Sequence, residues 1–121
     1  MNYTIHTNVQ YGFLELIDVP RLIDSCTEKW YNQTLCRVND SVVRLGVFNE
    51  GEFHWHKHDE EDEFFFVLKG ELYIEFENET VAIKQHQGIT VPKGEMHRPF
   101  VKEPTAVIMV EKDTVVAVGD G

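Results

Sequence analysis

The sequence predicts an all-β fold, an antiparallel barrel or sandwich, and two observations lead to this prediction. From Val42 onward, short apolar stretches rich in β-branched and aromatic residues follow one another closely. Turn-forming residues separate them, for example Asn49-Glu50-Gly51, Lys69-Gly70 and Lys93-Gly94. Because no helical pattern lies between these stretches, the strands are expected to pair with one another and pack as an antiparallel sandwich or barrel.

In residues 1–40 apolar and polar residues do not alternate strictly, and one short helix is predicted there. Asp18 suits an N-cap, and Pro20 falls in the first turn, where its missing N–H costs nothing. Leu22, Ile23 and Cys26 then share one face at helical spacing. We therefore expect a single domain over residues 1–121, with an N-terminal arm and short helix over 1–40 and a β-barrel over 41–119.

Nine short strands are predicted after the arm. They cover residues 42–48, 52–58, 63–68, 71–76, 80–84, 89–91, 98–101, 105–111 and 114–118.

The strand over 63–68 is apolar on both faces, whereas a strand with one wet face should alternate. If Glu63, Phe65 and Val67 point into the barrel, Phe64 and its same-face neighbours point outward and need a cover. Either the N-terminal arm or a second copy of the chain can supply it, and we expect a homodimer.

The composition excludes several classes of partner. The 121 residues carry 21 acidic and 11 basic side chains, a formal charge of −10. Phosphate backbones and anionic membrane surfaces attract clustered Lys and Arg, so neither nucleic acid nor a membrane is expected as a partner. No leader or spanning segment is visible, and Cys26 and Cys36 are too few for a disulfide framework. A cytoplasmic protein with reduced cysteines is predicted.

A group of histidines indicates a metal site. Alternate side chains of a strand share a face and lie roughly 6.6 Å apart, so His54, His56 and His58 are expected on one side. Two imidazoles at this spacing can bind one ion together. Zinc, iron, nickel, copper and manganese all accept imidazole and carboxylate, so ligand type does not choose the metal. The alternative is a surface strand with solvated histidines.

The stretch from Gly51 to Gly70 resembles the first motif of the cupin family. That motif has two histidines one residue apart, then a glutamate, and a glycine seven residues past the glutamate. Here these are His56, His58, Glu63 and Gly70. The count to Gly70 selects Glu63 among its acidic neighbours, and it selects the pair His56 and His58 over the pair that begins at His54.

Residues 91–97, Val-Pro-Lys-Gly-Glu-Met-His, resemble the second cupin motif, in which proline and glycine form a tight turn and His97 is the last ligand. The chain departs from the family pattern at His86-Gln87, where Gly-Asp is usual, and at Val101, where asparagine is common. The resemblance implies a jelly-roll barrel, often dimeric. It also implies that one divalent metal ion (Zn, Fe, Ni or Mn) is held by His56, His58, Glu63 and His97.

Three functions stay open at this point. The first is a metal-dependent enzyme acting on a small molecule, an oxygenase or an isomerase, although no arginine cluster near the site would grip a sugar phosphate. The second is a non-catalytic protein that binds or senses a small molecule with the same metal, and the third is a metal-free barrel. His54 is a candidate hydrogen-bond support for a ligand or a general base, but an ordinary inward histidine at the barrel rim fits equally well.

Overall fold

The computed structural model describes residues 3–120 and contains two β-sheets and one short helix. The six-stranded sheet has the strand order β1-β2-β3-β10-β5-β8, and the four-stranded sheet has the order β4-β9-β6-β7. In sequence order the elements are β1 (Tyr3–His6), α1 (Val19–Ser25), β2 (Trp30–Val38), β3 (Ser41–Phe48), β4 (Gly51–Glu52), β5 (Glu63–Lys69), β6 (Glu71–Glu75), β7 (Thr80–Lys84), β8 (Gly88–Val91), β9 (Arg98–Val101) and β10 (Thr105–Lys112).

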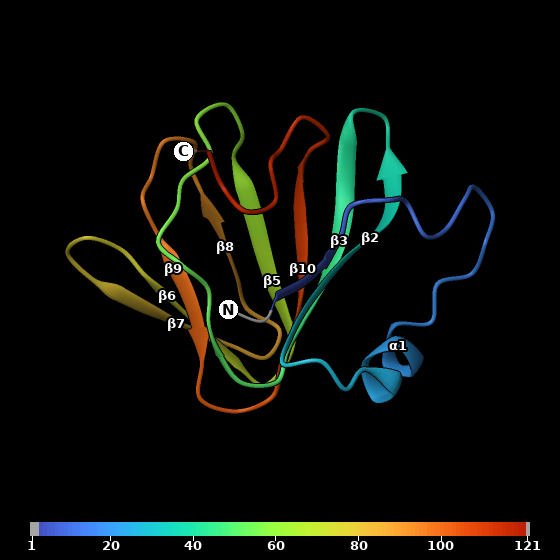
Figure 1. The fold of residues 1–121 in the computed structure, drawn as a ribbon, viewed down its shortest axis with the longest axis horizontal. Helices are drawn as coiled ribbons and strands as arrows, with labels where there is room; N and C mark the ends of the chain where they lie inside the picture. The colour runs from blue at the N-terminus through green and yellow to red at the C-terminus, as the bar shows by residue number, and fades with distance from the viewer. Residues whose placement is uncertain (1–2, 121) are drawn as a thin grey trace.

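The two sheets face each other and enclose the main core (Figure 1). All strand pairs are antiparallel except β1 with β2. Apolar side chains from both sheets fill the space between them, among them Trp30, Phe65, Leu72, Ile74 and Val107. The predicted all-β jelly-roll architecture with a short N-terminal helix is therefore confirmed.

The helix forms where the sequence predicts it. Asp18 is its N-cap, and the side chain accepts a hydrogen bond from the backbone N–H of Arg21. Pro20 lies in the first turn. The helix packs its apolar residues, including Leu22 and Ile23, against a second cluster on the outer face of the six-stranded sheet, built on Leu35, Leu45 and Val47.

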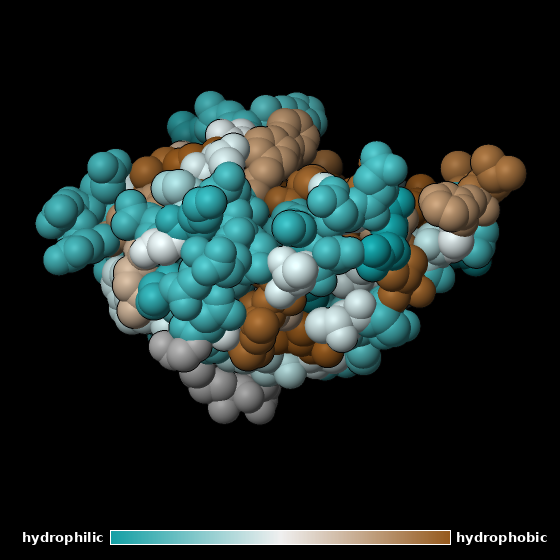
Figure 2. Space-filling view, turned by 90° about the horizontal axis from the view of Figure 1, so that it is seen from above, coloured by the Kyte–Doolittle hydropathy of each residue, from teal (hydrophilic) through white to brown (hydrophobic). Residues whose placement is uncertain are grey.

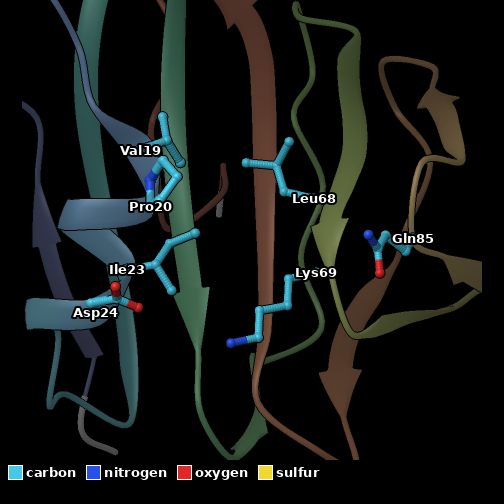
Figure 3. A pocket seen from close by; sticks show the side chains of 7 residues that line it. All are labelled: Val19, Pro20, Ile23, Asp24, Leu68, Lys69 and Gln85. Carbon is cyan, nitrogen blue, oxygen red and sulfur yellow. The ribbon is translucent and has the colours of Figure 1, made fainter.

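The strand β5 has the predicted orientation. Glu63, Phe65 and Val67 are buried inside, and Phe64 lies on the other face with 36% of its surface exposed. The N-terminal helix covers only one end of this outer row, at Leu68. A groove of about 400 Å³ lies between the helix and this face of the sheet, with α1 side chains on one side and Leu68, Lys69 and Gln85 on the other (Figure 3).

Two strands were missed in the arm. β1 and β2 join the six-stranded sheet, so residues before 41 contribute to the same sheet as those after it. Alternation does not reveal β2 because the run from Asn32 to Leu35 is buried without a break, covered by the core on one side and the α1 cluster on the other. The extent of the domain stays a prediction, and its residues 1, 2 and 121 lie outside the described residues.

Two predicted strands were wrong. Of the stretch 52–58, only Glu52 lies in a strand, as the second residue of β4. Beyond it the chain bonds to its neighbour at isolated points, Phe53 to Pro99 and His56 to His97. Residues 114–118 form no strand either. Local turns curl them, with the N–H of Val115 bonded to the carbonyl of Lys112 and that of Gly119 to the carbonyl of Val116.

Candidate metal centre

Four side chains converge at one end of the barrel. Nitrogen or oxygen atoms of His56, His58, Glu63 and His97 all lie within 4.8 Å of one another. All four residues are buried, with 8%, 4%, 6% and 1% of their surfaces exposed. The four residues that the cupin resemblance implied as ligands are thus brought together, away from bulk water.

Backbone pairing places these residues. His56 and His97 form an antiparallel bridge with two backbone hydrogen bonds of 3.0 and 2.9 Å, which brings their ring centroids to 4.3 Å. The N–H of Gly94 bonds to the carbonyl of His58 (2.7 Å), so the second-motif turn also holds the first-motif loop. Glu63 opens β5 and points inward from it.

Further along, Gly70 closes the β5–β6 turn at φ +83°, where an added Cβ would lie 2.6 Å from the carbonyl oxygen of Pro104. Only glycine fits this turn without strain, and this explains physically why the first motif ends in a glycine.

Backbone carbonyls set the protonation pattern of two histidines. Nδ1 of His56 lies 2.9 Å from the carbonyl oxygen of His54, and Nδ1 of His97 lies 2.8 Å from that of Glu95. A carbonyl oxygen only accepts, so each Nδ1 carries the proton and donates it. In the neutral ring this leaves Nε2 with a free lone pair, which is the form that binds a metal.

The donor set fits a divalent cation. Nε2 of His58 and Nε2 of His97 lie 3.5 and 3.6 Å from the same oxygen, Oε1 of Glu63. Oε1 of Glu63 and Nε2 of His97 are buried without a hydrogen-bond partner. Lone pairs that face one another in a buried space need a positive charge between them. Three imidazoles and a carboxylate are the ligand types that zinc, iron, nickel and manganese accept.

The electrostatics around these groups also favour a cation. Burial, and after it the neighbouring His97, lowers the pKa of His56 to about 4. Burial by itself would raise the pKa of Glu63, but contacts with His58, His97 and Glu111 hold it well below its usual range. Burial works against a charge on His58, yet the contact with Glu63 outweighs it, and the pKa of His58 is raised. Glu63 therefore stays negative.

Behind Glu63 lies a buried charged pair that sequence reasoning missed. Glu111 on β10 is the cross-strand partner of Glu63, and its carboxylate lies 3.4 Å from Nη1 of Arg44. Burial and the charge of Glu63 raise the pKa of Glu111, against the opposing effect of Arg44. The signal was a charged residue inside an apolar strand, Arg44 in β3 and Glu111 near the end of β10.

The side chain of His54 does not join the group. It is stacked on Phe53, and its Nε2 lies 2.6 Å from the carbonyl oxygen of Val118, to which it donates. It meets His56 edge-on, with ring centroids 5.5 Å apart, and the backbone carbonyl of His54 accepts the hydrogen bond from Nδ1 of His56. Arg98, the residue after His97, forms ion pairs with Glu75 (2.7 Å) and Glu52.

The C-terminal segment 113–120 lies over this end of the barrel, where Figure 1 places the C-terminus beside the loop that precedes β5. The N–H of Asp120 bonds to the carbonyl of Lys57 (2.8 Å), and the carboxylate of Asp120 accepts from the N–H of Asp59 (2.7 Å). Ala117 lines the small cavity beside His56 and Glu63, which measures about 20 Å³. That volume suits a water molecule and not an organic ligand.

The chain is similar to several known proteins. A family model described as a cupin domain matches residues 46–111. The uncharacterized protein YdbB of Bacillus subtilis (strain 168) is 47% identical over 85 residues, which are 69% of this chain and 74% of that protein.

Solved structures share the fold. A cupin-2 domain containing protein from Shewanella frigidimarina matches with a TM-score of 0.75 and 29% identity, over 80% of this chain and 94% of that chain. The conserved protein SPY1581, of unknown function, from Streptococcus pyogenes matches with a TM-score of 0.72 and 18% identity, over 93% of this chain and 95% of that one. At that identity the second likeness shows the fold alone.

Proposed function

Because this chain belongs to the cupin domain family, we propose that it binds one divalent metal ion through His56, His58, Glu63 and His97 and uses that ion to act on a small molecule. The observation that carries the proposal is the buried meeting of these four side chains, with lone pairs of Glu63 and His97 left without a partner. The ligand types admit Zn, Fe, Ni or Mn.

An enzyme of the oxygenase or isomerase type is the first candidate. Four protein ligands leave open positions on a six-coordinate ion, and open positions distinguish a reactive site from a sealed structural one. A bound ion of this kind supplies Lewis-acid or redox chemistry. The protein's own contribution is to exclude water, to keep Glu63 charged and to keep the proton on Nδ1 of His56 and of His97 through a hydrogen bond to a backbone carbonyl.

A non-catalytic binding or sensing role is the second candidate. The small cavity beside the site and the C-terminal segment over it suit a sensing role, because an organic molecule must displace the segment to reach the ion and that displacement can report its binding. Consumption of dioxygen by the metal-loaded protein would support the oxygenase. A tightly bound and unconverted small molecule would support the binder.

We also infer a homodimer that works in the cytoplasm on small molecules. Free Cys26 and Cys36 agree with a reducing compartment, and the net charge of −10 disfavours nucleic acid and anionic membranes as partners. Within residues 3–120, no helix is long and apolar enough to cross a bilayer. The outward Phe64 on β5 supports self-association.

Metal analysis tests the site. We expect His97→Ala and His56→Ala, loaded with metal and desalted beside the wild type, to retain at least tenfold less metal at this site, because each change removes a ligand. His6→Ala, an exposed histidine at the end of β1, is the control and should retain the wild-type content. A chelator should lower the melting temperature of the wild type by more than it lowers that of His97→Ala. Unchanged metal content in both ligand variants would overturn the ligand set.

A further inference from the structure

A second group of ligand-type atoms lies next to the first and includes the C-terminal segment. Atoms of His58, Glu61 and Asp120 lie within 4.8 Å of one another. His58 belongs to both groups, Glu61 lies in the loop before β5, and Asp120 comes from the far end of the chain.

One ring nitrogen of His58 has no role in the first group. Its Nε2 lies 3.5 Å from Glu63, and its Nδ1 is buried without any hydrogen-bond partner. The residue has only 4% of its surface exposed, so bulk water does not reach this nitrogen. A buried nitrogen left in this way is destabilising unless a ligand satisfies it.

Both carboxylates are held in place by other parts of the chain. Oε2 of Glu61 accepts a hydrogen bond from the hydroxyl of Thr114 (2.6 Å), and Oδ2 of Asp120 accepts one from the N–H of Asp59 (2.7 Å). Each carboxylate keeps a second oxygen for another ligand.

Asp120 acts on Lys57 through its charge, but no lysine or arginine among the described residues forms an ion pair with either carboxylate. Glu61 is buried, with 6% of its surface exposed. A buried carboxylate and a partly buried one, with a histidine ring nitrogen within 4.8 Å of both, form an arrangement that a cation stabilises.

We propose that His58, Glu61 and Asp120 form a second site for a divalent cation, which fastens the C-terminal segment over the barrel end. The site goes beyond the proposed function and shares only His58 with it. His58 would offer one ring nitrogen to each ion, and its remaining ring proton would pass to solvent. Water fills the remaining coordination positions.

Zinc is the probe for this site. We expect equilibrium dialysis against micromolar zinc, followed by elemental analysis, to find two ions per wild-type chain and one in Glu61→Gln and in Asp120→Asn. The control is Glu60→Gln, which removes the same charge from an exposed position in the same loop and should keep two ions. Equal zinc content in Glu60→Gln and Glu61→Gln would mean that zinc binding does not depend on the Glu61 carboxylate in particular, and it would overturn the proposal.

His97→Ala separates this proposal from the first. One wild-type ion that His97→Ala loses and Asp120→Asn keeps would refute the second site and leave the proposed function standing. A single wild-type ion that Asp120→Asn loses and His97→Ala keeps would refute the proposed function and leave the second site standing. No bound zinc would refute both.

The C-terminal segment provides an independent readout. Zinc should slow tryptic cleavage after the exposed Lys112 in the wild type by severalfold and have no such effect in Asp120→Asn. A rate that zinc changes equally in both proteins would show that the segment is not fastened through Asp120.

Discussion

At the scale of single residues, the pair Glu63 and Glu111 shows how a like-charged contact can serve a site. The two are cross-strand partners on β5 and β10, where two charges directly opposite would repel. Their pKa values shift in opposite directions: despite its burial, contacts with His58, His97 and Glu111 lower the pKa of Glu63, whereas burial and the charge of Glu63 raise that of Glu111. Arg44 behind Glu111 adds a buried positive charge.

His86 is a second residue whose conformation matters. It replaces the glycine usual at this position of the family and adopts φ +68°, in the left-handed region. Its backbone N–H bonds to the carbonyl of Val67 (2.7 Å), which holds it there. A side chain with Cβ is strained in that region, so His86 lowers the stability of its turn.

We therefore expect His86→Gly to raise the free energy of unfolding by about 0.5–1 kcal/mol, the relieved strain less the greater entropy of glycine in the unfolded chain. Urea denaturation measures the change. The control is Asn39→Gly, at φ +54°, where the gain should be smaller because asparagine adopts this region readily. A loss of stability in His86→Gly would mean that its side chain contributes more than the strain costs.

At the scale of elements, the C-terminal segment is the part that changes the access to the site. Besides the contacts of Asp120, its Val118 carbonyl accepts from His54, and Gly119 packs directly against His56. An added Cβ at Gly119, which has φ +95°, would lie 2.5 Å from Cβ of His56. The segment therefore covers the site only because residue 119 has no side chain.

Gly119→Ala should move the segment away from the barrel end. We expect a metal ion bound at the first site to pass to a colorimetric chelator severalfold faster than from the wild type, because the cover is displaced. Gly51→Ala is a closely matched control, since Gly51 has φ +97° and nothing within 4 Å of the added Cβ. It should cost stability and leave the transfer rate unchanged. Equal rates in all three proteins would show that the segment does not limit access.

At the scale of the whole molecule, two surfaces bear on self-association. The face of the six-stranded sheet around Phe64 and Phe66 is only partly covered. The loop between β1 and α1 exposes Phe13, Leu14 and Leu16 to 90%, 105% and 89%, and it forms the apolar projection at the right of Figure 2. Hydrophilic side chains cover much of the rest of that view, so these apolar groups stand out as places for a partner.

A homodimer through the β5 face predicts a mass in solution of twice the 14.1 kDa of one chain. We expect Phe64→Glu to shift this mass toward one chain in analytical ultracentrifugation, because a charge would be buried in the interface. Val38→Glu is the control: it places the same charge at an apolar strand residue that is 57% exposed, away from β5. A wild-type mass equal to one chain would contradict the dimer.

Much of this protein could be predicted from short-range patterns. The cap at Asp18, the strands from β5 to β10 and the turn at Gly70 follow from residues close together in the chain, because propensity and capping act locally. The spacing of His56, His58, Glu63 and His97, read through the family resemblance, also identified the four side chains that meet in the barrel.

Other features depended on long-range packing. β2 could not be recognised because both its faces are covered, one of them by a helix that comes before it in sequence. The stretch 114–118 looks like a strand, yet it turns across the barrel end, where contacts with residues 54–61 replace sheet pairing. Arg44 behind Glu111, and Asp120 beside His58, are likewise close only after the sheets have assembled. Local sequence determines which elements can form, whereas the free energy of packing decides which distant groups share a buried space.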